Sequence, residues 1–211
     1  MRRMMKSSGG VSLPEVMVTM VILVILLSSV SALYFGCARL YRRGEPANSA
    51  GRAAAWAIQR LSPDVRQALN CTILNAEKTA IRLRVPAKSW NTADHTHYNV
   101  IQQAGTDPYL VAGDYVYYYR GNSSGYSDPT GSYLWRLETT EDGTVVKTYA
   151  VATGVIDNPP PSGSTVSPPL FAYWPAPELY RCVLVTVTVQ KRMSSQTATS
   201  TMASEIALRN H

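Results

Sequence analysis

The sequence has few of the residues that carry catalytic and metal chemistry. It contains three histidines, His95, His97 and His211, and three cysteines among its 211 residues. No P-loop is present, and no cysteine has a histidine at the spacing of a nucleophile pair. A closed metal site takes about four ligands, whereas Asp94, His95 and His97 offer three in one polar segment. The sequence therefore predicts no enzyme active site, no cofactor, no metal site and no small-molecule substrate.

Charge is missing from one long segment near the N-terminus. Residues Val16 to Phe35 contain no charged side chain. About 20 helical residues at roughly 1.5 Å each cover the roughly 30 Å of a bilayer's hydrocarbon. Insertion gains about 0.3 to 0.6 kcal/mol for each large apolar residue, against a cost of about 2.5 to 3.5 for a central carboxylate. The segment is therefore predicted to span a membrane, with Glu15 tolerated at its start but in need of a cationic partner.

The residues before this segment resemble a known signal. The basic leader MRRMMKSS, the Gly9-Gly10 pair and Glu15 as the fifth residue after Gly10 are similar to the class III leader of type IV prepilins and pseudopilins. The resemblance implies that a prepilin peptidase cuts after Gly10 and methylates the new terminal amine of Val11. It also implies that Glu15 neutralises that amine on a neighbouring subunit in a filament. Val11 in place of the commoner Phe or Met, and Pro14 before Glu15, depart modestly from the pattern.

Two other interpretations of the N-terminus stay open. A general secretory signal peptide would share the basic start and apolar run, with cleavage after Ser29-Val30-Ser31 and before Ala32. The second interpretation is a signal-anchored protein or enzyme with an unrelated outer domain. Basic residues flank the span on both sides, so charge does not give its orientation. The resemblance implies a single-pass inner-membrane protein with a cytoplasmic N-terminus and a periplasmic C-terminal domain.

The chain is expected to divide into four parts. These are a prepilin leader (1–10), a transmembrane helix (11–38), an amphipathic stalk helix (39–70) and a β-rich periplasmic domain (71–211). The net charge of +6 comes from the leader and the stalk, because residues 70–211 hold 11 basic and 11 acidic residues. A neutral outer domain predicts no nucleic-acid binding there, and the stalk arginines are expected to meet membrane lipid or neighbouring subunits.

The fold class predicted is α+β, with one long N-terminal helix packed on an antiparallel β-sheet. Gly44-Glu45-Pro46 interrupts the helical pattern, which resumes over 47–69, and Ser62-Pro63-Asp64 is either a new N-cap or a kink. The 179–190 strand is expected near the sheet centre, and 199–209 suits a strand less securely than the others. Alternating or β-branched runs predict strands over 79–85, 114–119, 132–138, 144–152, 179–190 and 199–209.

Three segments of turn-forming composition separate these strands. Residues 86–113, 121–131 and 154–169 are predicted to be loops that either bind a partner or are mobile. Asn122, Ser123 and Asp128 suggest a calcium loop only faintly, since no bidentate Glu accompanies them, and an ordinary surface turn is the expectation.

A second, more diffuse resemblance covers parts of the outer domain. The segments RLSPDVRQAL, LWRLE, RCVLVTVTVQ and ASEIALRN look like the J-type minor pseudopilin of type II secretion and the related PilW-type minor pilins. This implies a subunit that assembles with other pilins or pseudopilins into a filament of a type II secretion system. The alternative is a pilin for adhesion, motility or DNA uptake.

The cysteines leave one covalent question open. In an oxidising compartment Cys71, at the end of the stalk helix, and Cys182, in the long strand, can pair and tie helix to sheet. Two buried thiols are the alternative. Cys37 lies at the expected membrane edge and is read as an ordinary small apolar residue.

Overall fold

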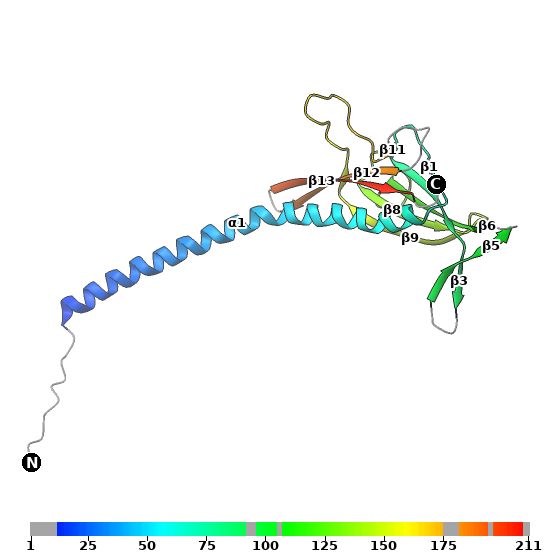
Figure 1. Cartoon of the computed structure of the whole chain (residues 1–211). Helices are drawn as coiled ribbons and strands as arrows, with labels where there is room; N and C mark the ends of the chain where they lie inside the picture. Colours follow the sequence, from blue (N-terminus) through cyan, green and yellow to red (C-terminus); the bar gives the residue numbers. More distant parts are fainter. Residues whose placement is uncertain (1–11, 92–95, 105–106, 175–181, 194–195, 209–211) are drawn as a thin grey trace, which may run out of the picture. The chain divides into compact units, whose positions relative to one another are not determined.

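The computed structural model describes residues 12–91, 96–104, 107–174, 182–193 and 196–208. The chain forms two compact units, residues 1–45 and 46–211, which are described separately below. One helix, α1 (Leu13–Gln67), is present in the described residues, and it begins in the first unit and ends in the second. Every other described element is a β-strand of the second unit (Figure 1). The chain thus has the α+β class that the sequence predicts.

Helix α1 runs without interruption through two prolines, Pro46 and Pro63. The predicted break at Gly44-Glu45-Pro46 is therefore wrong. Each proline removes one backbone donor, but the side chain of Pro46 is buried and starts the helix face that packs on the domain core. Ser62 does not cap a new helix, because its Oγ donates to the Ile58 carbonyl one turn back at 2.8 Å. Tertiary packing therefore overrides the local helix-breaking signals.

The larger sheet is an antiparallel meander of five strands. Its order is β1-β2-β7-β8-β9, so each strand pairs with the next one of the set along the chain. The predicted strands at 79–85, 114–119, 132–138 and 144–152 are confirmed with small changes of their ends. The strands are β1 (Asn70–Ile73), β2 (Ala80–Pro86), β7 (Ala112–Gly121), β8 (Tyr133–Thr139) and β9 (Val145–Thr153).

The second sheet is built around β12 (Cys182–Met193). This long strand pairs along one edge with β13 (Gln196–Ala207) and along the other with β10 (Val155–Ile156) and β11 (Phe171–Trp174). The central position expected for this strand is confirmed, and the less secure closing segment is a strand up to Ala207.

The segment between β2 and β7 was predicted to be a loop, and this prediction is wrong. It forms two small antiparallel hairpins, one from β3 (Lys88–Asn91) and β4 (Thr96–Asn99), the other from β5 (Ile101–Ala104) and β6 (Asp107–Leu110). Each of these strands has only four residues and lacks a long alternation of apolar side chains, so the composition alone predicts turns. Asp94 and His95 lie outside the described residues, and His97 is a residue of β4.

Small side chains bring the second half of α1 close to the sheets. Its buried positions recur every three or four residues, which is one face of a helix. Alanines occupy the buried positions from 50 to 57, and larger side chains occupy those at 61 and 65. Gly51 faces β13, where an added Cβ would lie 3.6 Å from Ser200 Oγ. The buried helix positions are Ala50, Ala54, Ala57, Leu61 and Val65.

Both faces of β12 are covered. Val183, Val185, Val187 and Val189 point into the core and are fully buried, as the alternation predicts. The other face was expected to be half exposed, but Thr186 and Thr188 are buried there too. Asn158 forms hydrogen bonds with the Thr186 carbonyl and the Thr188 hydroxyl, and it is described with the functional site below.

A polar cluster fixes the end of α1 to the sheet. Asp64 of α1 accepts hydrogen bonds at Oδ2 from the Tyr118 hydroxyl (2.7 Å) and from Arg136 Nε (2.8 Å). Arg136 also donates to Glu138 at 2.7 Å. Burial, and then the carboxylate of Asp64, raise the pKa of Tyr118. Burial works against the charge of Arg136, but its hydrogen bonds to Asp64 and Glu138 outweigh this and raise its pKa. Both groups therefore keep their protons at neutral pH.

We predict that Asp64→Ala lowers the free energy of unfolding by about 2 kcal/mol, because hydrogen bonds to a charged group contribute about 1.5 to 3. The matched control is Glu141→Ala, which removes an ion pair with Arg84 in which the glutamate is 69% exposed. An exposed pair contributes about 1 kcal/mol or less. Urea unfolding of the full-length protein in detergent measures both, and equal effects of the two variants would contradict the role given to Asp64.

Candidate functional site

The first turn of α1 places one carboxylate at the start of the apolar helix. The amides of Glu15 and Val16 donate to the Ser12 carbonyl at 3.0 and 3.2 Å, so Ser12 lies at the N-cap. Ser12 Oγ lies 3.5 Å from Glu15 Oε2. The spacing Ser-x-x-Glu is that of a capping box. An acidic side chain also interacts favourably with the positive end of the helix dipole. Glu15 therefore stabilises the helix start and is exposed there.

The helix beyond this turn is apolar on every side. All side chains from Ser12 to Cys37 are exposed within the chain, and an apolar helix that buries no face in its own protein requires lipid or other helices around it. Three of its hydroxyls are bonded within the helix. Thr19, Ser28 and Ser29 each donate to a carbonyl one turn back at 2.7 to 2.8 Å. These three donors are therefore already paired when the segment enters an apolar environment.

By length and composition α1 is the one described helix able to cross a membrane. A family model, the Prokaryotic N-terminal methylation motif, matches residues 5–31, a segment that begins before α1 and ends within it. The chain carries a prepilin leader. No curated protein and no solved structure matches the chain significantly.

The prepilin leader supports a type IV pilin-like protein that is anchored in a membrane by its N-terminal helix. The family that carries this motif is structural and not enzymatic. The α+β architecture, with one long apolar N-terminal helix and an antiparallel β domain, is consistent with a pilin-like fold. Gly10 and Val11, where cleavage and methylation are predicted, lie outside the described residues, so their roles stay predictions, as does the role of Glu15 in assembly.

Sequence reasoning missed Ser12, Asp64, Tyr118 and Arg136. The signal for Ser12 is visible in the sequence, because Ser12-Leu13-Pro14-Glu15 has the capping-box spacing followed by an apolar run. The other three lie more than 15 residues apart along the chain, and only the folded chain brings them together. Their hydrogen bonds are directed at one another, so this cluster attaches the helix to the sheet.

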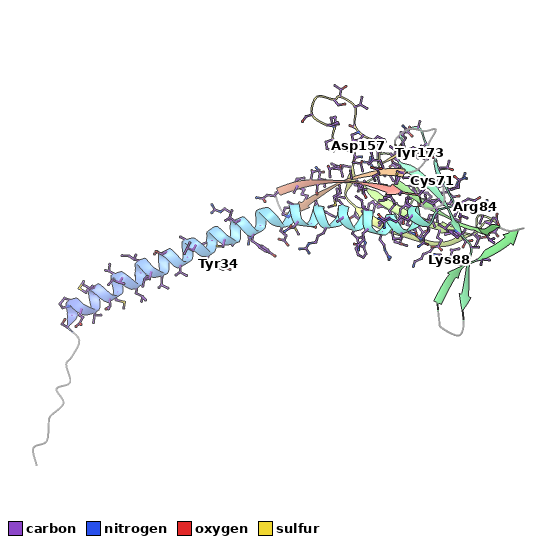
Figure 2. The ribbon with its side chains drawn as sticks, viewed as in Figure 1. Tyr34, Cys71, Arg84, Lys88, Asp157 and Tyr173 are labelled. Atoms are coloured by element: carbon purple, nitrogen blue, oxygen red, sulfur yellow. The ribbon has the colours of Figure 1, made fainter. Side chains whose placement is uncertain are left out.

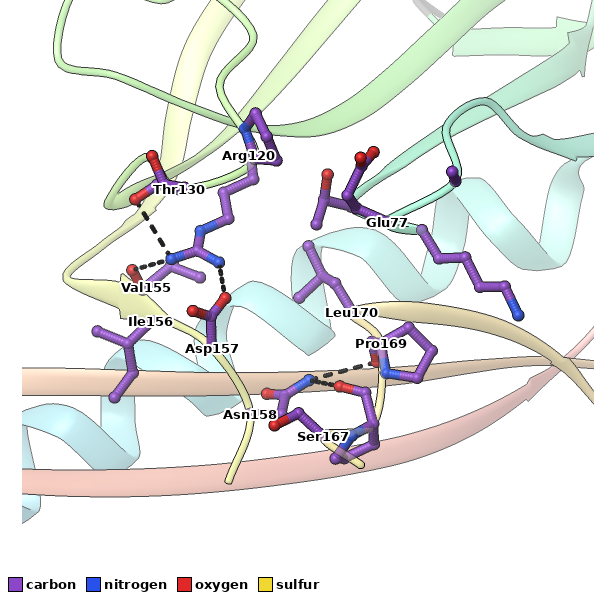
Figure 3. A pocket seen from close by; sticks show the side chains of 15 residues that line it. Glu77, Arg120, Thr130, Val155, Ile156, Asp157, Asn158, Ser167, Pro169 and Leu170 are labelled. Carbon is purple, nitrogen blue, oxygen red and sulfur yellow. Dashed lines mark hydrogen bonds and ion pairs between the residues drawn. The ribbon is translucent and has the colours of Figure 1, made fainter. Parts of the chain in front are cut away.

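A cavity of about 520 Å³ lies beside the 154–169 segment (Figure 3). The side chains of Arg120 and Asn158 line its polar side. Arg120 is 6% exposed, forms an ion pair with Asp157 and donates to the carbonyls of Gly131, Thr130 and Val155. These contacts hold the neighbouring turns in place and occupy the guanidinium.

Asn158 closes the base of the same segment. Its amide nitrogen donates to the carbonyls of Pro168 and Thr186, both at 3.0 Å, and its oxygen accepts from Thr188 Oγ1 at 2.7 Å. A buried asparagine bonded on both sides of its amide joins the two ends of the 159–167 segment to β12. The residues 159–167 themselves are exposed, so part of this predicted loop has a rigid base.

The 121–131 loop is a pair of ordinary turns. Asn122 Oδ1 accepts from the amides of Ser124 and Tyr126 at 2.9 and 3.1 Å, and Asp128 Oδ1 accepts from the amide and hydroxyl of Thr130. The Thr130 hydroxyl is the main cause that lowers the pKa of Asp128. The oxygens of Asn122 and Asp128, considered above for calcium, therefore hold the turns.

Residues 121–125 of that loop, Gly-Asn-Ser-Ser-Gly, match the GxSxG pattern of hydrolases. A nucleophile elbow requires a strand followed at once by a helix. Here the segment joins strand β7 to strand β8, and Ser123 lies exposed in the loop. The match therefore lacks the structural context of a nucleophile.

The two cysteines of the predicted disulfide occupy different environments. Cys71 of β1 is a free thiol that packs against the core, opposite Leu83 (Figure 2). Cys182 begins β12 directly before Val183, whose side chain is fully buried in the core. Successive side chains of a strand point to opposite faces, so Cys182 lies on the face of β12 away from that core. The pairing stays a prediction, and this geometry argues against it.

We predict that N-ethylmaleimide at pH 8 labels Cys37 and leaves Cys71 unlabelled in the native protein. Cys37 is exposed, whereas burial raises the pKa of the Cys71 thiol to about 12, and the thiolate is the reactive form. Peptide mass spectrometry reads the labelling. In urea without reductant, Cys71 is expected to react. Labelling that appears only after reduction would show that Cys71 is in a disulfide.

Proposed function

We propose that the chain is a minor pseudopilin or minor pilin that assembles into a type IV pilus-like filament, with a type II secretion system as the first choice. The observation that carries this proposal is the methylation motif over residues 5–31 together with Glu15 in the first helical turn. The motif requires processing of the leader, and the apolar helix is then kept as the membrane anchor and filament segment.

In this proposal prepilin peptidase cuts after Gly10 and methylates the amine of Val11. The new amine then lies four residues before Glu15 in the sequence. Within a bundle of apolar helices, the amine of one subunit and the Glu15 carboxylate of the next neutralise each other. A buried charge that loses its partner costs several kcal/mol, so the pair favours one axial register between subunits.

The protein would accordingly lie in the inner membrane, with a cytoplasmic leader and a periplasmic β domain. The four segments that resemble J-type pseudopilins support the secretion assignment. They contribute to the end of α1, to β8, to β12 and to β13. The β domain would contact neighbouring minor subunits or secreted protein.

Glu15 has two separable contributions, a helix cap within the chain and a charge between chains. We predict that Glu15→Gln and Glu15→Ala both lower incorporation into sheared filaments at least tenfold, with membrane insertion unchanged. Glutamine keeps the capping geometry and loses the charge, so this substitution isolates the ion pair. The fraction of the subunit that sediments with filaments, relative to the fraction in the membrane, measures the effect in the native host.

The matched control is Ser12→Ala, which removes the cap partner and keeps the carboxylate. Loss of an N-cap costs about 1 kcal/mol of helix stability, and incorporation is expected to stay near the wild-type value. If Glu15→Gln assembles normally while Ser12→Ala does not, Glu15 serves the helix start and the proposed pairing between subunits is wrong.

A further inference from the structure

An open groove runs between α1 and β9 within the second unit, and we call it the α1–β9 groove. It consists of two adjoining cavities of about 400 and 460 Å³ that share Trp56 of α1. One wall is the helix from Arg52 to Asp64, and the other is β9 with two side chains of β8. Both walls belong to well-packed elements, so the groove is present before any partner binds.

The groove carries an excess of positive charge. Four cations line it, Arg52, Arg60, Arg136 and Lys147, against two carboxylates, Asp64 and Glu138. Both carboxylates are bound by Arg136. Arg52, Arg60 and Lys147 form no ion pair with any residue in the described parts of the chain, and all three side chains are exposed.

Two of these three cations, Arg60 and Lys147, lie over aromatic rings. Arg60 Cζ lies 5.6 Å from the centre of the Trp56 ring and 6.0 Å from that of Tyr149. Lys147 Nζ lies 5.4 Å from the Tyr149 ring. Cation–π contacts of this kind contribute about 0.5 to 1 kcal/mol at exposed sites. Trp56 is itself 54% exposed, so the groove presents an apolar surface beside its charges.

Strand β9 contributes an unpaired edge. It is the last strand of the five-stranded sheet and pairs with β8 alone among the described strands. A strand edge presents a row of backbone N–H and C=O groups that accept another strand. Val145 and Val146, at the start of this edge, are 59% and 57% exposed.

We propose that the α1–β9 groove binds an extended, acidic segment of a partner protein, which adds as a strand to the edge of β9. Main-chain hydrogen bonds to the edge would supply affinity, as in other strand additions. Carboxylates of the segment would meet Arg52, Arg60 and Lys147, and apolar side chains would lie on Trp56 and the exposed valines. The cations thereby select the partner by charge.

The partner is a different protein from this chain. No described strand here carries more than one carboxylate, so a second copy offers no acidic strand. A nucleic acid fits less well, because a free sheet edge needs main-chain partners and residues 70–211 are neutral as a whole. The inference goes beyond the proposed function and does not rest on it, since it concerns a surface of the β domain in the full-length protein.

The test uses full-length protein in detergent and a fluorescein-labelled ten-residue peptide of alternating Glu and Val as the probe. Fluorescence anisotropy, corrected for binding to empty micelles, is expected to show saturable binding that weakens with added salt. The double variant Arg60→Glu, Lys147→Glu is expected to weaken binding at least tenfold. The matched control is Arg192→Glu, an exposed charge reversal on β12 outside the groove, which should leave binding unchanged.

Three unlabelled probes are tested as competitors of the labelled peptide on the wild-type protein. This part of the test therefore does not depend on the folding of the variant. A Lys-Val peptide and a Glu-Pro peptide are expected to fail, the first through its charge and the second because proline cannot supply ladder donors. Competition by Glu-Pro as strong as by Glu-Val would overturn strand addition. Tighter binding of a ten-residue oligothymidine would overturn the choice of a protein partner, and equal binding by the double variant would overturn the groove itself.

Discussion

A carboxylate at the start of a helix that carries no other charge over its apolar length is the constraint on which the account depends. The first turn of α1 already gives Glu15 a local role beside the Ser12 cap. That role does not neutralise its charge, because hydroxyl and amide groups are not cations. Lipid or a bundle of apolar helices around this segment would leave the carboxylate in a medium of low dielectric constant, where it needs a positive partner. A methylated N-terminal amine on an adjacent subunit is the cation that a prepilin leader supplies.

The same helix meets two different packing requirements. Residues 13–37 expose apolar side chains in every direction, and this is a surface for lipid or for identical helices. From Pro46 onward, only one face is buried, and small side chains at Ala50, Ala54 and Ala57 let the helix lie close to the strands. The Asp64 cluster then fixes its last turns to β7 and β8 through Tyr118 and Arg136. Asp64 and Arg136 of this cluster also line the α1–β9 groove, so the contacts that attach the helix form part of the groove's wall.

Much of this fold follows from local patterns, and the exceptions have physical reasons. Alternation in β12 and its neighbours predicts the strands because buried and exposed faces alternate with a period of two. The helix break at Pro46 was predicted wrongly, since propensity does not include the burial of that side chain. The hairpins of residues 88–110 were missed because four-residue strands show too little periodicity. Asn158 and the Asp64 cluster depend on contacts between distant segments, which no single stretch of sequence reveals. For the site, the leader pattern predicts the residues and the order of processing, but not the cap at Ser12.

The most direct test of the central claim is the mass of the N-terminal peptide of the protein purified from its native membrane. We expect a mature chain that begins at methylated Val11 and still contains the apolar helix, and a Gly10→Ala variant that retains the full leader. A mature chain that begins at Ala32, or an untrimmed chain that begins at Met1 in the wild-type protein, would contradict it. In either case Glu15 would have no processed amine to meet.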